Sequence, residues 1–386
     1  MVPDAEPPPP APAVPVAARG GRLLALDAAR GVVILLMAVD HSSGEFNAGR
    51  LITDGVFLFK PGTPLPPAQF FTRWITHLCA PTFVFLAGVS LALSIARRRA
   101  RGVSAWDIDR HLLARGLIIM AAEIVPSTFW MEPGHYLFQV LYAIGSSYLC
   151  MIALRRLPAP VLAALALAEL VCGEAITHAL GAGSPGTSLL AALLFTGGPR
   201  DHLIIAYPTL PWLAIMLFGY AWGERLRRET KAPALHPARL AGAGAALLAL
   251  FVVLRGLNGY GNMGLPREGG SVVQWLHVSK YPPSITYVAL ELGIMALLIA
   301  LLARAGERRP FSLASPLLVF GQTSMFFYLL HIPLLALLAH ALGVYHALGI
   351  GAAFGFAAVA ALVLFPLCRW YRTFKATHPA SLARFF

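Results

Sequence analysis

The sequence predicts an all-α protein, a polytopic transmembrane bundle of about ten helices with both termini in the cytoplasm. Two observations lead to this prediction. Of the 386 residues, 58% are hydrophobic and only 12% are charged, whereas about 25% are charged in a typical soluble domain. Apolar stretches of about 20 residues, the length that crosses the hydrocarbon core, also recur along the chain. So little polar surface excludes a soluble or a disordered protein.

Ten segments are long and apolar enough to be predicted as membrane spans. They are 22–43, 68–96, 109–129, 136–154, 159–181, 204–225, 237–256, 283–304, 315–341 and 347–370. A weaker apolar stretch at 187–196 is about half a span and is predicted to be re-entrant or interfacial. Ten crossings put both termini on the same side of the membrane.

Positively charged residues predict which side that is. The basic clusters that follow alternate spans all fall on the side of the termini, at 97–101, 155–156, 225–231, 304–309 and 369–375. Positively charged loops stay in the cytoplasm. The net charge of +12 is therefore attributed to topology and to anionic lipid headgroups, and no nucleic-acid partner is predicted because the basic residues form no single stripe.

The spans form one predicted domain, residues 22–373, flanked by two tails. Residues 1–21 are rich in Pro and Ala and lack the apolar run of a signal peptide, so they are predicted to be a disordered tail. Residues 374–386 are predicted to be a cytoplasmic tail. The four cysteines lie in or beside apolar segments without a CxxC pair, which favours buried packing over a zinc or redox motif.

Ionisable residues in the first span are candidates for chemistry, because a charge inside the membrane costs at least ~2.5–3.5 kcal/mol. Asp27 and Arg30 are three residues apart and are predicted to pair on one helix face. Arg30 and His41 lie three turns apart on the same face, and Asp40 precedes His41 at the outer end. The structural alternative for Asp40 and His41 is a polar helix end that meets water.

The second span adds Arg73 and His77, one helical turn apart. Because sequential helices usually pack together, His77 is expected in the outer half of the bundle, near Asp40 and His41. A neutral imidazole there suits a general base, and a nearby carboxylate would orient it. The alternative for His77 is a structural hydrogen bond between helices.

Other polar residues in the spans give weaker signals. Glu123 in the third span is expected either to pair with an arginine or to bind substrate, and His331 in the ninth is a further binding candidate. Glu174 and His178 are one turn apart, but two ligands do not make a metal site, so no metal is predicted.

Motifs add little more. The sequence contains no phosphate-binding loop, no GxSxG elbow and no HExxH motif, so ATP-driven transport, α/β-hydrolase chemistry and zinc proteolysis lose their usual support. Gly351 and Gly355 form a GxxxG pair, which predicts close helix packing within the bundle or in a homodimer.

Five segments share a pattern with known membrane enzymes: LDAARGVVILLMAVDH, HLCAPTFVFLAGVSLALS, YPTLPWLAIMLFGY, KYPPSITY and GQTSMFFYLLHIPLL. They resemble the heparan-α-glucosaminide N-acetyltransferase-like family over roughly residues 22–370. The resemblance implies a multi-pass enzyme that takes acetyl from cytosolic acetyl-CoA and delivers it to a glucosamine amine across the membrane.

The family's catalytic pair is an Asn that ends the first helix and a His in the next loop. Asp40 stands at the Asn position. Leu51 stands where the His is expected, so His41 or His77 would have to replace it.

Residues and resemblance together predict an acyltransferase of the bacterial inner membrane. Acyl-CoA, a co-substrate rather than a bound cofactor, would enter from the cytoplasm and meet a basic rim formed by Arg97–Arg101 and Arg115. His77, or else His41, would deprotonate an amine or hydroxyl of a glycan or lipid-linked sugar at the outer face, or carry the acyl group itself. Asp40 would orient that histidine. Residues predicted to bind substrate or acyl-CoA are Arg30, Arg73, Arg115, Glu123 and His331.

Two alternatives belong to other functional classes. A transporter or flippase would relay protons through the buried Asp, Glu and His side chains, although no internal repeat of the kind common in transporters is visible. A non-catalytic membrane protein would leave the polar residues of the first two spans without a role.

Overall fold

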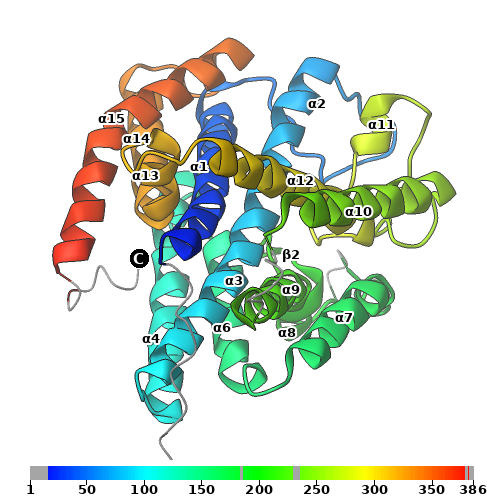
Figure 1. The fold of residues 1–386 in the computed structure, drawn as a ribbon. Coiled ribbons are helices and arrows are strands. Elements are labelled where there is room, and N and C mark those ends of the chain that lie inside the picture. Colours follow the sequence, from blue (N-terminus) through cyan, green and yellow to red (C-terminus); the bar gives the residue numbers. More distant parts are fainter. Residues whose placement is uncertain (1–15, 183–185, 229–234, 379–380, 382–386) are drawn as a thin grey trace, which may run out of the picture.

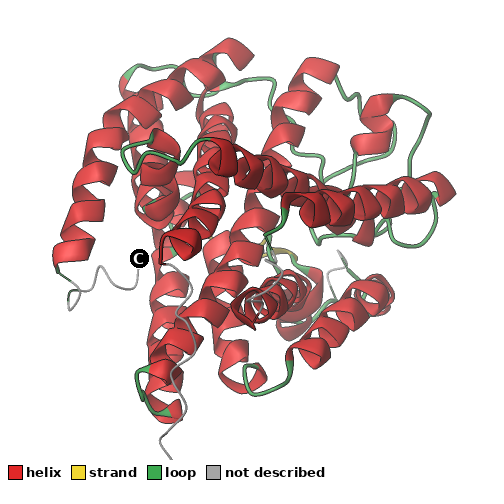
Figure 2. Cartoon of the chain, viewed as in Figure 1, coloured by secondary structure: helices red, strands yellow, loops and turns green. Residues whose placement is uncertain are grey.

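Helices form almost all of the regular structure, and they surround one small three-stranded sheet (Figures 1 and 2). The computed structural model describes residues 16–182, 186–228, 235–378 and 381. The mostly helical architecture agrees with the predicted fold class. The sheet was not predicted.

The elements follow one another along the chain in the order shown by the colours of Figure 1. The helices are α1 (Val16–Phe46), α2 (Pro67–Trp74), the 3₁₀ helix η1 (Ile75–Leu78), α3 (Cys79–Ala100), α4 (Ala105–Ala122), α5 (Ile124–Trp130), α6 (Val140–Leu154), α7 (Ala159–Ala179), α8 (Leu189–Ala191), the π-helix η2 (Ala192–Thr196), α9 (Thr209–Arg228), α10 (Pro237–Leu257), α11 (Val272–Leu276), α12 (Ile285–Arg308), α13 (Pro316–Gln322), α14 (Ser324–Ala341) and α15 (Ile350–Thr377). The strands are β1 (Tyr136–Phe138), β2 (Gly198–Arg200) and β3 (Leu203–Ile205).

Helix α1 lies in the interior and packs against helices from both ends of the chain, namely η1 and α3 on one part of its surface and α12 to α15 on the rest (Figure 1). Its small and branched residues Ala28, Ala29 and Val33 are fully buried. The residues that the sequence singles out on α1 therefore face other protein elements.

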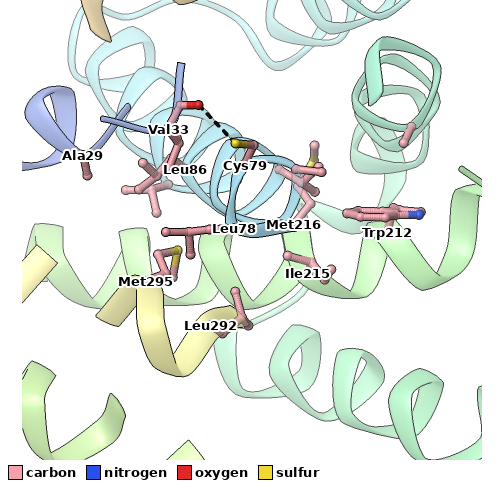
Figure 3. Close-up of a cluster of buried hydrophobic side chains, with 14 of the residues drawn as sticks. Ala29, Val33, Leu78, Cys79, Leu86, Trp212, Ile215, Met216, Leu292 and Met295 are labelled. Carbon is pink, nitrogen blue, oxygen red and sulfur yellow. Dashed lines mark hydrogen bonds between the residues drawn. The ribbon is translucent and has the colours of Figure 1, made fainter. Parts of the chain in front are cut away.

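A layer of apolar side chains fills the junction of α3, α9 and α12, with Leu86, Met216 and Met295 among its members (Figure 3). Gly219 of α9 sits directly against α3, because a Cβ atom there would lie 2.0 Å from the backbone oxygen of Phe85. Only glycine permits so close an approach of the two backbones.

Seven helical segments among the described residues are long and apolar enough to cross a membrane. They are Pro67–Ala100, Ala105–Trp130, Ala159–Ala179, Pro237–Leu257, Ile285–Arg308, Ser324–Ala341 and Ile350–Thr377. The outermost of them present large apolar side chains outward. Leu257 of α10 and Leu362 of α15, for example, are 74% and 75% exposed. Such faces are suited to lipid.

Three further predicted spans are helical but do not belong to this set. They correspond to α1, α6 and α9. α6 has only 15 residues. α9 is mostly enclosed by protein, with Trp212 and Ile215 fully buried, and α1 carries charged residues. A helix shielded by its neighbours does not need an apolar surface all round. The total of ten crossings and the side of the termini stay predictions.

The first and last helices of the chain have boundaries that differ from the predicted ones. α1 begins at Val16, inside the stretch predicted to be tail, because the segment from Val16 to Phe46 contains no proline and alanines favour helix. Residues 1–15 lie outside the described residues. α15 continues to Thr377, beyond the predicted span end. The half-span at 187–196 forms α8 and η2, which are too short to cross a membrane.

The GxxxG pair on α15 is not used for packing against described parts of the chain. A Cβ atom at Gly351 or Gly355 would meet nothing within 4 Å. The homodimer stays a prediction.

The sheet lies near the C-terminal end of α1 and helps to enclose the site. β3 is its central strand and pairs in parallel with β1, where Tyr136 faces Leu203, and antiparallel with β2, where Gly198 faces Ile205. Each strand has only three residues. An alternating pattern this short cannot be recognised in a sequence.

Candidate active site

Two histidines from opposite ends of the sequence form a hydrogen-bonded pair. Nδ1 of His41, on α1, lies 2.7 Å from Nε2 of His331, on α14. Nδ1 of His331 lies 2.9 Å from the backbone oxygen of Phe327. Since that carbonyl can only accept, Nδ1 of a neutral His331 carries the proton, and its Nε2 accepts from Nδ1 of His41. The remaining nitrogen of His41, Nε2, therefore holds a lone pair.

Aromatic residues hold the ring of His41 in place. Trp130 of α5 packs edge-on against it, with ring centroids 4.7 Å apart, and its indole nitrogen donates to Oε1 of Glu45 at 2.9 Å. Tyr328 lies 6.0 Å away on another side. Nε2 of His41 has no hydrogen-bond partner among the described residues and is not sealed by protein, because His41 lines a cavity.

Arg73 of α2 joins α1 to the loop that follows it. Its Nη1 donates to both carboxylate oxygens of Asp40 at 2.7 Å, and its Nη2 donates to Oδ2 of Asp54 at 2.8 Å. Arg50 also contacts Asp40, with Nη2 3.2 Å from Oδ1. Asp40 therefore binds two arginines, and the predicted role of orienting a histidine passes to other residues.

Asp54 is a buried carboxylate in the loop between α1 and α2. Burial alone would raise the pKa of Asp54. The positive charge of Arg73 and the nearby His77 together lower it by more than burial raises it, so the pKa lies well below the usual value of 3.8. The group is thus a carboxylate at neutral pH.

His77 has a different environment from His41. Its Nε2 lies 3.0 Å from Oδ2 of Asp54, and its backbone oxygen accepts from the hydroxyl of Tyr287 at 3.1 Å. The side chain is 2% exposed. α1 and η1 pack together as predicted, but Asp54, rather than Asp40, contacts the His77 ring. Neither ring nitrogen of His77 has a hydrogen-bond partner of good geometry among the described residues, so the choice between the two predicted roles of His77 stays open.

Three adjoining cavities run along α1. The Arg30 cavity, about 320 Å³, lies toward the N-terminal end of α1. The His41 cavity, about 430 Å³, lies at the C-terminal end. Between them is a waist of about 30 Å³. The waist shares Phe83, Val140 and Tyr328 with the Arg30 cavity. It shares Asp40, His41, Gln139, Tyr207 and Lys280 with the His41 cavity. His77 and His331 line none of the three.

Arg30 is held by several partners in its cavity. It pairs with Asp27 at 2.8 Å, which confirms the predicted pair on one helix face, and it also donates to the hydroxyl of Ser90 at 2.5 Å. Arg115 and Lys375 line the same cavity, so three cations gather there. Arg97–Arg101 at the end of α3 are not among its lining residues.

Glu123 lines none of these three cavities and pairs with no arginine in the described part of the chain. It accepts the backbone N–H groups of Gln139 and Tyr142 at 3.1 and 2.7 Å. The first turn of a helix leaves its N–H groups without helical partners, and Glu123 satisfies two of them at the start of α6. This placement corrects the expected arginine partner.

The chain is similar to a known family of membrane enzymes. Residues 22–253, more than half of the chain, match the family model described as heparan-alpha-glucosaminide N-acetyltransferase, catalytic. The chain belongs to this family. The resemblance inferred from the sequence is therefore confirmed, and family membership supports a membrane acetyltransferase rather than a transporter. Comparison with curated proteins finds no match.

The match to the acetyltransferase family covers part of the site. Asp40, His41 and Arg73 lie within the matched residues, whereas Lys280 and His331 lie beyond them. Asp40 contacts two arginines, Arg73 and Arg50, which offset the charge of its carboxylate. His41 is the histidine that reaches the cavities from this end of α1.

Sequence reasoning missed three charged residues of this candidate site: Arg50, Asp54 and Lys280. Each lies in a loop between spans, where apolar periodicity carries no information. One signal was available. Loops that connect membrane helices lie at the ends of the bundle. Charged residues in the Gly- and Pro-rich loops next to the candidate spans are therefore placed to reach a site at that end.

Proposed function

We propose that this protein transfers an acetyl group from cytoplasmic acetyl-CoA to an amine or hydroxyl of a glycan or lipid-linked sugar at the outer face of a bacterial inner membrane. The observation that supports this most directly is the position of His41. It lines the waist between two cavities, with Nδ1 engaged by His331 and a lone pair on Nε2. A general base is useful where donor and acceptor meet.

The Arg30 cavity suits the donor. A narrow pantetheine arm would lie in it and bring the thioester to the waist, while the nucleotide remains at the mouth. Arg30, Arg115 and Lys375 supply positive charge for phosphate groups, and arginine forms charge-assisted hydrogen bonds with phosphate. Positively charged loops favour the cytoplasmic side for this end of α1.

The His41 cavity suits a sugar acceptor. At about 430 Å³ it falls within the range of ligand pockets, about 300–1,000 Å³. Tyr207, Tyr281 and Tyr345 line it, as does the carboxylate of Glu45. Flat aromatic faces and a few polar groups are a common combination in ligand sites of this size.

The transfer proceeds in two stages, in which His41 takes up one proton and then releases it. Nε2 of His41 takes the proton from the acceptor amine or hydroxyl as the acceptor heteroatom attacks the thioester carbon. The carbonyl π electrons move onto oxygen and form a tetrahedral oxyanion. When this collapses, the carbon–sulfur bond breaks and the CoA thiolate takes the proton from His41. His331 accepts from Nδ1 throughout and so keeps the ring oriented.

The test compares two histidines in the purified protein in lipid nanodiscs with labelled acetyl-CoA. Acceptors are glucosamine and cell-envelope extracts. We expect His41→Gln to lower kcat by roughly 10²–10⁴-fold, the usual contribution of a general base. His178→Gln, on α7 and outside the three cavities, with a side chain that is 53% exposed, serves as the control and should leave kcat unchanged.

His77→Gln separates the two sequence-based candidates. We expect it to lower thermal stability, because it disturbs the buried pair with Asp54, and to leave the kcat of folded protein within severalfold. Wild-type protein that neither binds acetyl-CoA nor transfers acetyl would refute the proposed function. Full activity in folded His41→Gln protein would refute the assignment of the base.

A further inference from the structure

Lys280 is a buried cation that no carboxylate neutralises directly. It lies between α11 and α12, is 4% exposed, and lines both the waist and the His41 cavity. Among the described residues, no carboxylate oxygen lies within ion-pair distance of its ammonium group. The nearest partners that the structure records are the ring faces of Tyr281 and Tyr207, with centroids 5.2 and 5.9 Å from Nζ.

The acidic groups around Lys280 do not contact it. Asp40 and Asp54 are already engaged by Arg73. Glu291 of α12 is buried, its Oε1 lacks a hydrogen-bond partner, and it forms no ion pair with Lys280. A buried ammonium without a contact partner is unfavourable. The free-energy cost of burying this ammonium group is offset during function if an anion forms beside it.

The backbone holds Lys280 in a fixed place. Its N–H donates to the backbone oxygen of Asp54 at 2.8 Å, and Gly55 pairs with Tyr281 in the next position. The hydroxyl of Ser279 donates to the oxygen of Pro282 at 2.9 Å. The loop that carries Lys280 is thus attached to the loop after α1, which keeps the ammonium group preorganised.

The waist brings Lys280 close to His41. Both residues line this cavity, which is the narrowest of the three. A group that enters the waist therefore lies within reach of the base on one side and of the ammonium on the other. An anionic substituent deep in the acceptor would instead sit in the larger His41 cavity.

We propose that Lys280 is a catalytic residue whose ammonium group stabilises the oxyanion of the tetrahedral intermediate. The inference rests on the proposed acetyl transfer. As the acceptor bonds to the thioester carbon, the carbonyl π electrons become the oxyanion beside Nζ. When the carbon–sulfur bond breaks, those electrons re-form the carbonyl and the thiolate leaves with the proton held by His41. The ammonium neither gains nor loses a proton.

The experiment compares Lys280→Met with Lys280→Arg in nanodiscs. Two readouts are used: transfer of labelled acetyl to glucosamine and release of labelled acetate from acetyl-CoA. Removal of one oxyanion donor typically lowers kcat by about 10²–10³-fold. We expect that loss in Lys280→Met with the Kd for acetyl-CoA and the KM for glucosamine nearly unchanged, and partial recovery in Lys280→Arg. Lys60→Met, in an exposed loop, is the matched control.

Several outcomes would overturn the assignment. An unchanged kcat in Lys280→Met would do so, as would a higher KM with unchanged kcat, which would indicate an anion-binding subsite for the acceptor. The double variant Lys280→Met/Glu291→Leu tests a structural role, because restored kcat in it would show that Lys280 only balances Glu291. If wild-type protein binds acetyl-CoA but shows neither transfer nor hydrolysis, the proposed function fails instead.

Discussion

At the scale of single residues, the contrast between His41 and His77 depends on which ring nitrogens remain available. Nε2 of His77 faces the carboxylate of Asp54 in a sealed environment. His41 uses Nδ1 to bind His331 and keeps Nε2 toward a cavity. A hydrogen-bond acceptor behind a histidine sets the tautomer and leaves the opposite nitrogen basic. In the proposed mechanism His331 therefore positions the ring of His41.

The role of His331 can be tested with two substitutions. Leu at this position removes the acceptor for Nδ1 of His41, and we expect kcat to fall by about tenfold or more. Gln retains an acceptor oxygen, so His331→Gln should recover part of the loss. Steady-state kinetics with acetyl-CoA and glucosamine are the measurement. Equal kcat in the Leu and Gln variants, with both folded, would argue against positioning by His331.

At the scale of elements, glycine contacts determine how the helices approach. Gly219 brings α9 against the backbone of α3 at Phe85, and Gly321 of α13 does the same against α1, where a Cβ would lie 1.8 Å from the oxygen of Asp27. The second contact places Gln322 beside Asp27, to whose Oδ2 it donates at 3.2 Å. Helix packing and the arrangement of the Arg30 cavity are thus connected.

This packing predicts a difference between two glycine substitutions. Gly219→Ala requires α3 and α9 to separate, and we expect a loss of roughly 1–3 kcal/mol, as for other overpacked sites. Gly242→Ala on α10, where a Cβ meets nothing within 4 Å, should leave stability unchanged or raise it slightly, since alanine favours helix. Thermal unfolding in the same detergent measures both. Equal stability of the two variants would contradict the close contact.

At the scale of the whole molecule, polarity is sorted by position in the bundle. α7, α10 and α15 lie at the periphery with exposed apolar faces, whereas α1 lies inside and carries charged residues that pair or line cavities (Figure 1). Charges are tolerated inside a membrane protein where they pair with each other or line a cavity. This sorting explains why α1 does not qualify as a span by its own composition.

The predicted orientation can be tested by cysteine labelling in cells. The background variant is Cys172→Ser, which removes the exposed native cysteine. We expect Gly270→Cys, in the loop before α11, to react with a membrane-impermeant maleimide in intact cells, because this loop carries few basic residues. Leu313→Cys, next to a basic cluster, should react only after permeabilisation. The reverse labelling pattern would invert the topology.

Part of the site followed from the sequence. The Asp27–Arg30 pair was predicted because three residues on a helix span one turn, and it is present. The packing of α1 against the start of the second span was expected from their order in the chain, and Arg73 joins them through Asp40. The order of His77 and His41 as candidate bases stays a prediction, and our proposal reverses it because only His41 lines a cavity; no periodicity reports whether a buried nitrogen meets a carboxylate or a cavity.

The sequence by itself determined the class of protein, the positions of the helices and the family, because composition, helical periodicity and motifs are properties of contiguous residues. Only the tertiary structure decided which side chains meet at the waist. His331 reaches His41 across 290 positions of sequence, and Lys280 comes from a loop between α11 and α12. Such encounters depend on how helices pack and loops attach, and packing between distant segments leaves no local pattern in the chain.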